Sequence, residues 1–251
     1  MKLSVIMPVY NEATTVLEGI ERVLALSLPL ELIAVNDGST DASAAIMAGV
    51  RDPRFKMLSE PKNRGKGWAI RRAIEVARGD VVIIQDADLE YDPSDYEQLL
   101  TPIKEGRALV VYGNRLHSGN TRFSYLRYLL GGMLLTFVTN LLYGCSLHDE
   151  PTCYKLMDAR ILKALRLQCV GFEFCPEVTA KVCRLGYRIV EMPISYTPRN
   201  YEEGKKIHFM DGLKALWVLF RTRFQRASSF VEPGAALPRL QGDTSMSPQG
   251  D

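Results

Sequence analysis

This sequence has few histidines and no closely spaced pair of cysteines. The chain of 251 residues has three histidines, and none of them stands at the spacing of a zinc site. Its five cysteines are odd in number and include no C-x-x-C pair, so the sequence indicates neither a cysteine metal site nor a disulfide framework. We therefore expect reduced thiols, as in a cytosolic protein.

A long apolar run is also missing. A helix that spans a bilayer needs about 18–20 consecutive apolar residues. The nearest stretch, residues 129–143, is shorter and contains Thr136, Thr139 and Asn140. We expect that the chain does not cross a membrane by itself. The first residues, MKLSVIMPVYNE, turn polar too early for a signal peptide and predict a strand instead.

Charge of one sign is not in excess. The formal net charge of +2 gives no whole-molecule field toward nucleic acid or membrane, so any basic site must be local. The basic residues lack the regular aromatic interleaving of an RNA-binding sheet, and we predict no nucleic-acid partner. With 47% apolar and 24% charged residues the composition is ordinary, and the length fits one large α/β domain.

The sequence does contain a buried-strand pattern that ends in an acidic cluster. Residues 79–93 read GDVVIIQDADLEYDP. The β-branched run at 81–84 predicts a strand buried on both faces of a parallel sheet. Four carboxylates follow it, namely Asp86, Asp88, Glu90 and Asp92. Crowded carboxylates repel one another, and a hard cation such as Mg²⁺ or Mn²⁺ relieves this. The alternative is an acidic turn with a helix cap.

Strand and helix patterns alternate up to about residue 112. Strand-like runs at 3–7, 32–35 and 55–58 are separated by segments whose apolar residues recur at the helical period. This alternation, with polar turns at the strand ends, predicts a doubly wound, Rossmann-like α/β sheet.

Polar side chains follow three of the predicted strands. Asn11 and Glu12 follow the first strand, Asp37 follows the second, and the acidic cluster follows the fourth. Ligands of open α/β sheets bind outside the carboxyl ends of the strands, so we predict a binding cleft here. Asp37 either accepts hydrogen bonds from a base or ribose or serves as an Asx-turn residue. Arg64 and Lys66, in a segment that is no Walker P-loop, lie near a diphosphate or in a solvated loop.

Two helical patterns and a polar tail follow. Residues 125–143 carry an apolar stripe that suits a core helix or a membrane-surface helix, and Tyr125 and Tyr128 near arginines favour the interface. Residues 208–226 combine apolar and basic side chains, which favours an anionic membrane surface, with packing onto the sheet as the alternative. The composition of 227–251 predicts a disordered tail.

Several motifs, in order along residues 2–224, resemble those of the inverting family 2 glycosyltransferases of GT-A fold. The motifs are PVYNE, NDGSTD, NRGKGWAI, QDADLEYDP, GNR, HDEPTCYK and PRNYEEGKK. The resemblance is strongest to the transferases that use a polyprenyl phosphate, such as dolichyl-phosphate mannosyltransferases. It implies a GT-A domain over residues 1–207 that includes the helix near 125–143.

The resemblance also implies roles for individual residues. Around the nucleotide sugar it implies Pro8, Tyr10, Glu12, Asp37, Lys66, Asp86 and Ala87. As ligands of Mn²⁺ or Mg²⁺ it implies Asp86, Asp88 and Glu90. Around the acceptor phosphate it implies Arg115, Arg127, Arg199 and Lys205, with Arg122 and Lys206 as alternatives to Arg127 and Lys205. The catalytic set that it implies is Asp88, Asp149 and Arg115.

The sequence departs from the family pattern at two of these motifs. Glu90 stands where some relatives carry glutamine, which adds negative charge beside the expected metal. In HDEPTCYK, Asp149 matches the family, and Lys155 stands at the position of the family's arginine.

The reaction that the resemblance implies is transfer of a sugar, with inversion, from a nucleotide donor to a polyprenyl or dolichyl phosphate. Mannose from GDP-mannose is the first expectation, and UDP-glucose and UDP-GlcNAc are alternative donors. A hydroxyl acceptor would need a base, for which Asp149 is the candidate. A rival of another class is a non-catalytic sugar-nucleotide-binding adaptor that docks a membrane protein. We expect a cytoplasmic chain, peripheral at the cytoplasmic membrane face.

Overall fold

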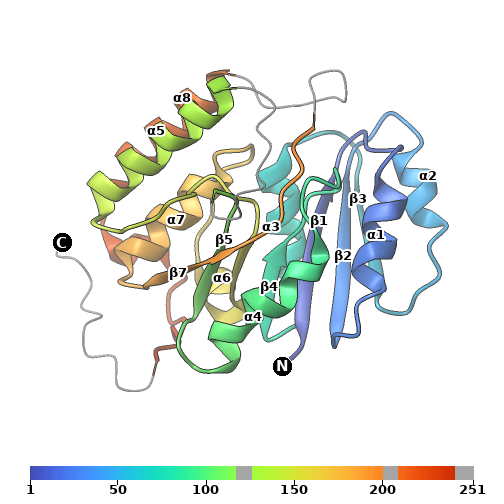
Figure 1. The fold of residues 1–251 in the computed structure, drawn as a ribbon, viewed down its shortest axis with the longest axis horizontal. Coiled ribbons are helices and arrows are strands. Elements are labelled where there is room, and N and C mark those ends of the chain that lie inside the picture. The colour runs from blue at the N-terminus through green and yellow to red at the C-terminus, as the bar shows by residue number, and fades with distance from the viewer. Residues whose placement is uncertain (117–125, 200–208, 241–251) are drawn as a thin grey trace.

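The computed structural model describes residues 1–116, 126–199 and 209–240, shown in Figure 1. Within these ranges the strands form a seven-stranded sheet of order β3-β2-β1-β4-β6-β5-β7. The strands are β1 (Leu3–Val9), β2 (Leu30–Asp37), β3 (Phe55–Glu60), β4 (Val81–Ile84), β5 (Val110–Asn114), β6 (Lys155–Asp158) and β7 (Ile189–Pro193).

The first four strands are parallel, as the strand–helix alternation predicts. β1 pairs in parallel with β2 and β4, and β2 pairs in parallel with β3. β4 is buried along its whole length, which confirms the reading of its apolar run. β6 differs, because it runs antiparallel between β4 and β5. The sheet is therefore mixed, and the segment that leads into β6 returns from the edge where β4 ends.

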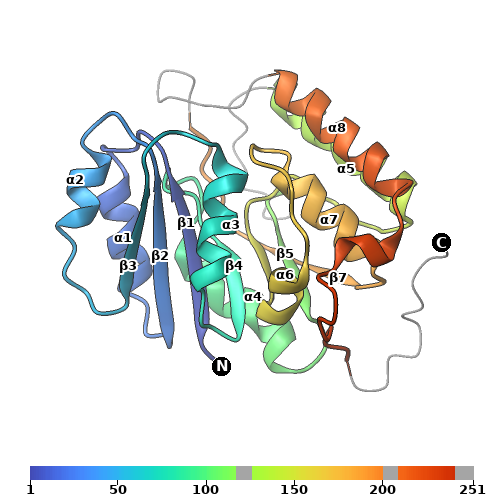
Figure 2. The same ribbon diagram turned by 180° about the vertical axis from the view of Figure 1, so that it is seen from behind.

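Helices cover both faces of the sheet. Figures 1 and 2 show α1 (Val16–Leu24) and α4 (Tyr96–Lys104) on one face and α3, α6 and α7 on the other. The remaining bounds are α2 (Ser43–Ala48), α3 (Lys66–Val76), η1 (Pro93–Asp95), α6 (Ala159–Ala164) and α7 (Phe174–Arg184). In α1, for example, the apolar residues Val16, Ile20 and Val23 recur at the helical period and share one buried face, so the helix packs with this face against the sheet.

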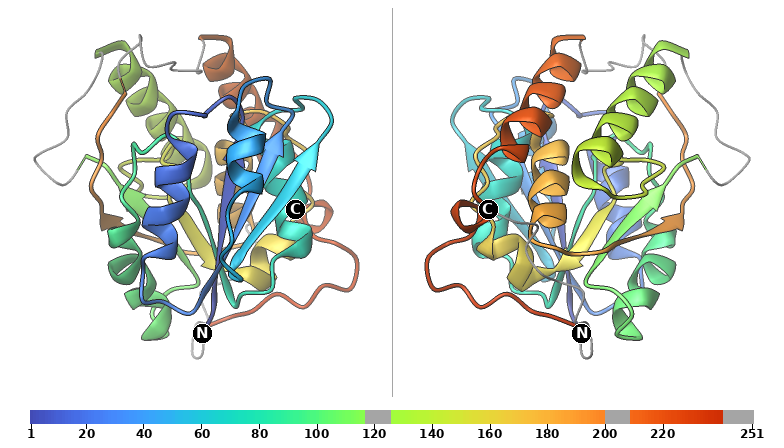
Figure 3. Two further views of the ribbon diagram at one scale, coloured as in Figure 1. Left: turned by 90° about the vertical axis from the view of Figure 1, so that its right-hand side faces the viewer. Right: turned by 90° about the vertical axis from the view of Figure 1, so that its left-hand side faces the viewer.

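Two further helices, α5 (Leu126–Tyr143) and α8 (Phe209–Arg223), flank α7 at one end of the molecule (Figure 3). Tyr143 at the end of α5 donates a hydrogen bond to the carbonyl of Leu219 in α8, at 2.5 Å. Both helices thus pack back onto the domain and leave an outer side uncovered. In the described part of the chain no helix is both long and apolar enough to cross a membrane.

The outer side of these two helices is rich in exposed apolar side chains. We call these side chains the α5–α8 apolar face. They are Leu130, Leu134, Phe137 and Leu141 of α5, then Met210, Leu213, Trp217 and Phe220 of α8, and Phe224 just beyond α8. Phe137 is 63% and Trp217 62% exposed. Exposed apolar side chains that gather on two neighbouring helices are typical of an interaction site.

The segment 227–240 does not form the disordered tail that its composition predicts. It contains η3 (Ala227–Phe230), the side chain of Phe230 is buried, and Val231 bridges to Leu165. Tyr187 donates a hydrogen bond to the carbonyl of Pro238, at 2.9 Å. The reason is that the segment carries apolar side chains that reach the domain, since Ala227 and Phe230 are buried and Leu237 packs against the core. Residues 241–251 of the expected tail lie outside the described residues.

Candidate active site

Asp37, the last residue of β2, fixes the loop that leads into α3. Its two carboxylate oxygens accept hydrogen bonds from the backbone N–H groups of Arg64 (2.9 Å) and Gly65 (2.7 Å). Burial raises the pKa of Asp37, and these two N–H groups oppose the rise. Gly65 has φ of 105°, and a Cβ there would lie 2.3 Å from the carbonyl oxygen of Val170. Glycine is therefore required where this loop meets residue 170.

Lys66, the first residue of α3, lies against the acidic motif. Its Nζ is 2.6 Å from Asp86 and 3.6 Å from the thiol of Cys153. Burial lowers the pKa of Lys66, but the charge of Asp86 outweighs it and holds the pKa above its usual range. Lys66 and Asp86 come together as the resemblance implies, whereas nothing in the sequence pointed to Cys153.

A tryptophan borders the same loop. The guanidinium carbon of Arg64 lies 4.2 Å from the ring centre of Trp68, and that of Arg71 lies 5.4 Å from it. The indole is thus held by two cations at the start of α3, where cation–π attraction stabilises the arrangement.

Asp88 is the most perturbed carboxyl group of the acidic motif. Burial raises its pKa to about 7, with further contributions from the charges of Asp86 and Glu90, and Arg199 opposes the rise. Its Oδ2 lies 3.0 Å from the Arg199 guanidinium, which also contacts both carboxylate oxygens of Glu12 at 2.9 and 3.0 Å. The carboxyl ends of β1 and β4 thus meet at one arginine from the far end of the domain.

Glu90, which the resemblance implies as a metal ligand, accepts hydrogen bonds from residues 196–199 on both carboxylate oxygens. One oxygen accepts the hydroxyl hydrogen of Tyr196 (2.7 Å), and the other accepts the backbone N–H of Arg199 (2.9 Å). Its backbone carbonyl accepts the N–H of Thr197 (2.9 Å). Glu90 therefore anchors residues 196–199 across the acidic motif.

Arg115 and Asp149 form a second buried ion pair at the same edge. The Nε and Nη2 of Arg115 lie 2.8 and 2.7 Å from the two carboxylate oxygens. Burial raises the pKa of Asp149, but the Arg115 charge and hydrogen bonds outweigh it and hold the pKa below its usual range. The ring of Tyr196 lies 5.0 Å from the guanidinium, and Glu191 accepts the backbone N–H of Asp149 at 2.9 Å. A carboxylate held in this way is a weak proton acceptor.

Lys155 does not reach the cleft. It is buried in β6, where its Nζ donates hydrogen bonds to the carbonyl of Glu150 (2.7 Å) and the hydroxyl of Thr179 (3.1 Å). The Nζ also lies 3.8 Å from the ring centre of Tyr112. Lys155 therefore supports the segment behind Asp149 and does not take the family arginine's place at the cleft.

The other residues of the implied sites fall in three groups. Pro8 is the residue before the last in β1 and pairs with Val35, and Ala87 is buried between the two aspartates. Tyr10 lies on the turn that follows β1. Of Arg127 the structure describes the backbone at the start of α5, and Lys205 lies outside the described residues, as do the alternatives Arg122 and Lys206.

The carboxylate oxygens at the end of β4 suit a hard divalent cation that also binds the substrate. In the described ranges no three His, Cys, Asp or Glu side chains form a ready metal cluster. Mg²⁺ and Mn²⁺ are commonly bound by one or two carboxylates plus substrate phosphates, and Asp86 and Asp88 offer carboxylates at the strand end. Such an ion would neutralise the diphosphate that leaves in a sugar transfer.

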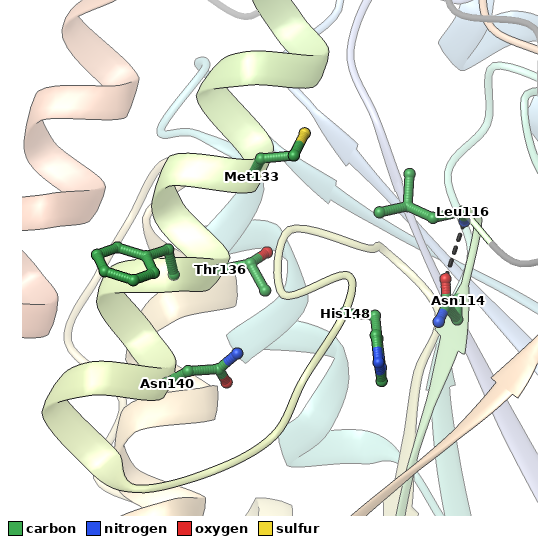
Figure 4. Close-up of a pocket in the computed structure, with 7 residues that line it drawn as sticks. Asn114, Leu116, Met133, Thr136, Asn140 and His148 are labelled. Atoms are coloured by element: carbon green, nitrogen blue, oxygen red, sulfur yellow. Dashed lines mark hydrogen bonds between the residues drawn. The ribbon is translucent and has the colours of Figure 1, made fainter.

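A groove of about 390 Å³ lies between α5 and the segment around Asn114 and Leu116, the residues before and after Arg115 in the chain. Figure 4 shows Met133, Thr136 and Asn140 of α5 on one side of it and Leu116, Asn114 and His148 on the other. Its lining is mostly apolar, and Phe137 joins it to the α5–α8 apolar face. The sequence did not reveal this groove, because it forms between elements that are distant along the chain.

Solved structures share this architecture. Glucosyl-3-phosphoglycerate synthase from Mycobacterium tuberculosis, in complex with UDP, superposes with a TM-score of 0.69 at 19% identity, over 96% of this chain and 84% of that one. The same synthase with Mn²⁺, UDP-glucose and phosphoglyceric acid gives a TM-score of 0.65 at 19% identity, over the same shares of both chains. At this identity the likeness concerns the fold. The mixed seven-stranded α/β sheet of the described residues is of the GT-A class.

The chain belongs to glycosyl transferase family 2, whose pattern matches residues 4–166. It is 30% identical over 215 residues to the low-salt glycan biosynthesis hexosyltransferase Agl6 of Haloferax volcanii, covering 84% of this chain and 51% of that protein. It is 29% identical over 212 residues to a dodecaprenyl-phosphate galacturonate synthase of Rhizobium johnstonii, covering 82% and 62%. An undecaprenyl-phosphate 4-deoxy-4-formamido-L-arabinose transferase of Proteus mirabilis is 30% identical over 212 residues, covering 81% and 62%. The chain thus spans half to three fifths of these relatives.

Proposed function

We propose that this protein transfers a sugar from a nucleotide diphosphate donor to a polyprenyl phosphate at a membrane surface, with Mn²⁺ or Mg²⁺ as cofactor. The observation that supports the proposal is the apolar groove lined by Asn114 and Leu116, the sequence neighbours of Arg115, which continues through Phe137 into the α5–α8 apolar face. A lipid whose phosphate lies at the arginine would have its hydrocarbon on this surface.

The donor would bind at the carboxyl ends of β1, β2 and β4. Asp37 and the loop that it fixes would hold the nucleoside, while Lys66 and a metal at Asp86 and Asp88 would face the diphosphate. These cations would stabilise the negative charge that develops on the leaving nucleotide, which is the main electrostatic task of the reaction. The resemblance favours GDP-mannose as donor. The relatives are named for other sugars, so the experiment below includes other sugar nucleotides as well.

The state of Asp149 favours a phosphate acceptor over a hydroxyl. A hydroxyl must lose a proton as it attacks, and the candidate base is ion-paired to Arg115 with a lowered pKa. A lipid phosphate is already anionic near neutral pH and needs no base. Arg115 would contribute positive charge near the phosphate, while its Nε and Nη2 remain on the carboxylate of Asp149.

The α5–α8 apolar face would place the cleft at a membrane. Lys214, Arg221, Arg223 and Arg226 stand on or just after α8, next to the exposed aromatic side chains. Apolar contact combined with basic residues favours an anionic bilayer surface, which agrees with a peripheral position at the cytoplasmic face.

A turnover experiment tests the proposal. The chain is incubated with radiolabelled GDP-mannose, UDP-glucose or UDP-GlcNAc, Mn²⁺, and undecaprenyl phosphate in detergent, and label in the lipid fraction is counted. We expect label transfer that requires both the lipid phosphate and the metal. Transfer to water-soluble hydroxyl acceptors without lipid phosphate would favour the hydroxyl alternative. Saturable donor binding with no turnover on any acceptor would favour the adaptor alternative.

A further inference from the structure

The guanidinium of Arg199 bridges two strand ends of the cleft. It contacts both oxygens of Glu12, at 3.0 and 2.9 Å, and Oδ2 of Asp88, at 3.0 Å. Glu12 follows β1 and Asp88 follows β4, so two carboxylates that would repel each other share one positive charge. The side chain of Arg199 is largely shielded from solvent, which strengthens these ion pairs.

The backbone that carries Arg199 is tied to the same motif. Glu90 accepts the Tyr196 hydroxyl hydrogen at 2.7 Å and the N–H of Arg199 at 2.9 Å, one on each carboxylate oxygen. Tyr196 also bridges to Tyr91 through the backbone. A carboxylate offers two acceptor oxygens where an amide offers one. The glutamate at position 90 therefore fits an anchoring role for residues 196–199.

We propose that Arg199 is a tethered cation that is held by Glu12 and competes with the divalent metal for Asp88. Binding of the metal together with the donor diphosphate would release the guanidinium from Asp88 toward the acceptor phosphate. In this scheme Glu90 is a positioning residue that keeps Arg199 at the cleft, and it is not a metal ligand. The inference deepens the proposed function and rests on it.

The charges explain why metal and diphosphate act together. A divalent ion near Asp88 repels the guanidinium and attracts the carboxylate that the guanidinium now holds. The metal alone must displace an ion pair, whereas the diphosphate adds oxygen ligands to the metal and so makes the exchange favourable. The released arginine then finds its best partner in a phosphate anion. Donor binding would thus prepare the acceptor site before the lipid arrives.

Metal affinity without nucleotide tests this competition. The affinity of wild type and of the Arg199→Gln variant for Mn²⁺ alone is measured by electron paramagnetic resonance of free Mn²⁺. We expect the variant to bind Mn²⁺ about tenfold more tightly, since coupling between competing sites commonly reaches this size. Arg199→Lys, which keeps the charge, should remain closer to wild type. Arg71→Gln is the matched control, because it removes the same charge from α3, where Arg71 donates to the carbonyl of Gln168.

An Arg199→Gln variant that binds Mn²⁺ no more tightly than Arg71→Gln would overturn the competition. Circular dichroism and the melting temperature show whether the variant folds. If it does not, the guanidinium NMR signals of Arg199 in the wild-type chain provide the test. They should shift when Mg²⁺ and UDP or GDP are added together and not with nucleotide alone, and the absence of that shift would also overturn the inference.

Failure of the inference is distinguishable from failure of the proposed function. If Mn²⁺ binding and sugar transfer both depend on the nucleotide while Arg199→Gln leaves the affinity for Mn²⁺ unchanged, the competition is wrong and the transferase stands. If wild type neither binds Mn²⁺ with UDP or GDP nor transfers label from any donor, the transferase proposal falls and the inference falls with it.

Discussion

Arg115 and Asp149 hold each other at two points, with Nε and Nη2 of the arginine 2.8 and 2.7 Å from the two carboxylate oxygens. The backbone N–H of Arg115 adds a third contact, at 2.9 Å. The pair joins the end of β5 to the segment that leads into β6. It therefore fixes the arginine side chain against Asp149 and leaves the carboxylate little basicity.

The first prediction concerns this pair. Asp149→Asn should lower the free energy of unfolding at pH 7 by about 3 kcal/mol, because it leaves a buried guanidinium without its counter-charge. The folded-state pKa of Asp149 is depressed below its ordinary value of 3.8, so its contribution is present above that pH and is lost as pH falls toward the folded-state pKa. Urea unfolding from pH 7 to pH 3 checks this. A gap between wild type and variant that does not narrow below pH 4 would contradict it.

The second prediction concerns the metal. Asp88→Asn should reduce turnover by about a hundredfold or more, since the metal supplies several kcal/mol of charge stabilisation in such reactions. The variant should keep its fold, because Asp88 lies beyond the buried body of β4. Transfer rates at increasing Mn²⁺, with the melting temperature as a control, measure both effects. Wild-type activity of the variant in EDTA-treated buffer would remove Asp88 from the metal site.

The third prediction uses two glycines with positive φ. Gly65→Ala should destabilise the protein by about 3 kcal/mol and weaken donor binding, because its Cβ would meet the Val170 carbonyl at 2.3 Å in addition to the backbone strain. Gly106→Ala is the matched control, since it has φ of 68° and nothing within 4 Å of the added Cβ. It should cost about 1 kcal/mol and leave the donor affinity unchanged. Urea unfolding and calorimetric titration with UDP and GDP measure the two effects, and equal losses in both variants would refute the close-approach argument.

The fourth prediction concerns the membrane surface. Trp217→Ala and Phe224→Ala should each weaken binding to anionic liposomes by about tenfold, because these side chains would bury much of their area in the bilayer. Both are exposed, at 62% and 72%, so the melting temperature should change little. Leu17→Ala on α1, 44% exposed, is the control and should bind as wild type does. Co-sedimentation measures binding. Unchanged binding in both aromatic variants would show that the α5–α8 apolar face does not contact lipid.

Point variants are preferable to truncation in this experiment. Removal of residues 208–251 would also delete Phe230, whose side chain is buried in the domain. A truncated chain could therefore lose membrane binding because it has lost its fold.

The sequence predicted features that depend on local patterns. The run at 81–84 and the acidic residues after it identified β4 and the acidic cluster at its end, because a wholly apolar strand must be buried and polar groups at its end must lie at the sheet edge. The resemblance correctly identified the family. The pairing of Lys66 with Asp86 was not predicted, because the sequence left Lys66 either near a diphosphate or in a solvated loop.

Contacts between distant segments could not be predicted in this way. Arg199 and Glu12 are 187 residues apart, and no periodicity links them. The antiparallel placement of β6 depends on how its partners pack, since its four residues show no signal of direction. Composition misjudged residues 227–240, because the Ser, Pro and Gly residues outweighed the apolar side chains, such as Phe230 and Leu237, that pack against the domain.

The chain has two tryptophans, one near the proposed donor site and one on the proposed membrane surface. Trp68 lies between two arginines at the donor loop, and Trp217 is exposed on the α5–α8 apolar face. Intrinsic fluorescence therefore carries two separable signals, one quenched or shifted by nucleotide and the other blue-shifted when the indole enters hydrocarbon. The Trp217→Phe and Trp68→Phe variants each keep one of these signals, so comparing the time courses of their emission would give the order in which donor and membrane engage.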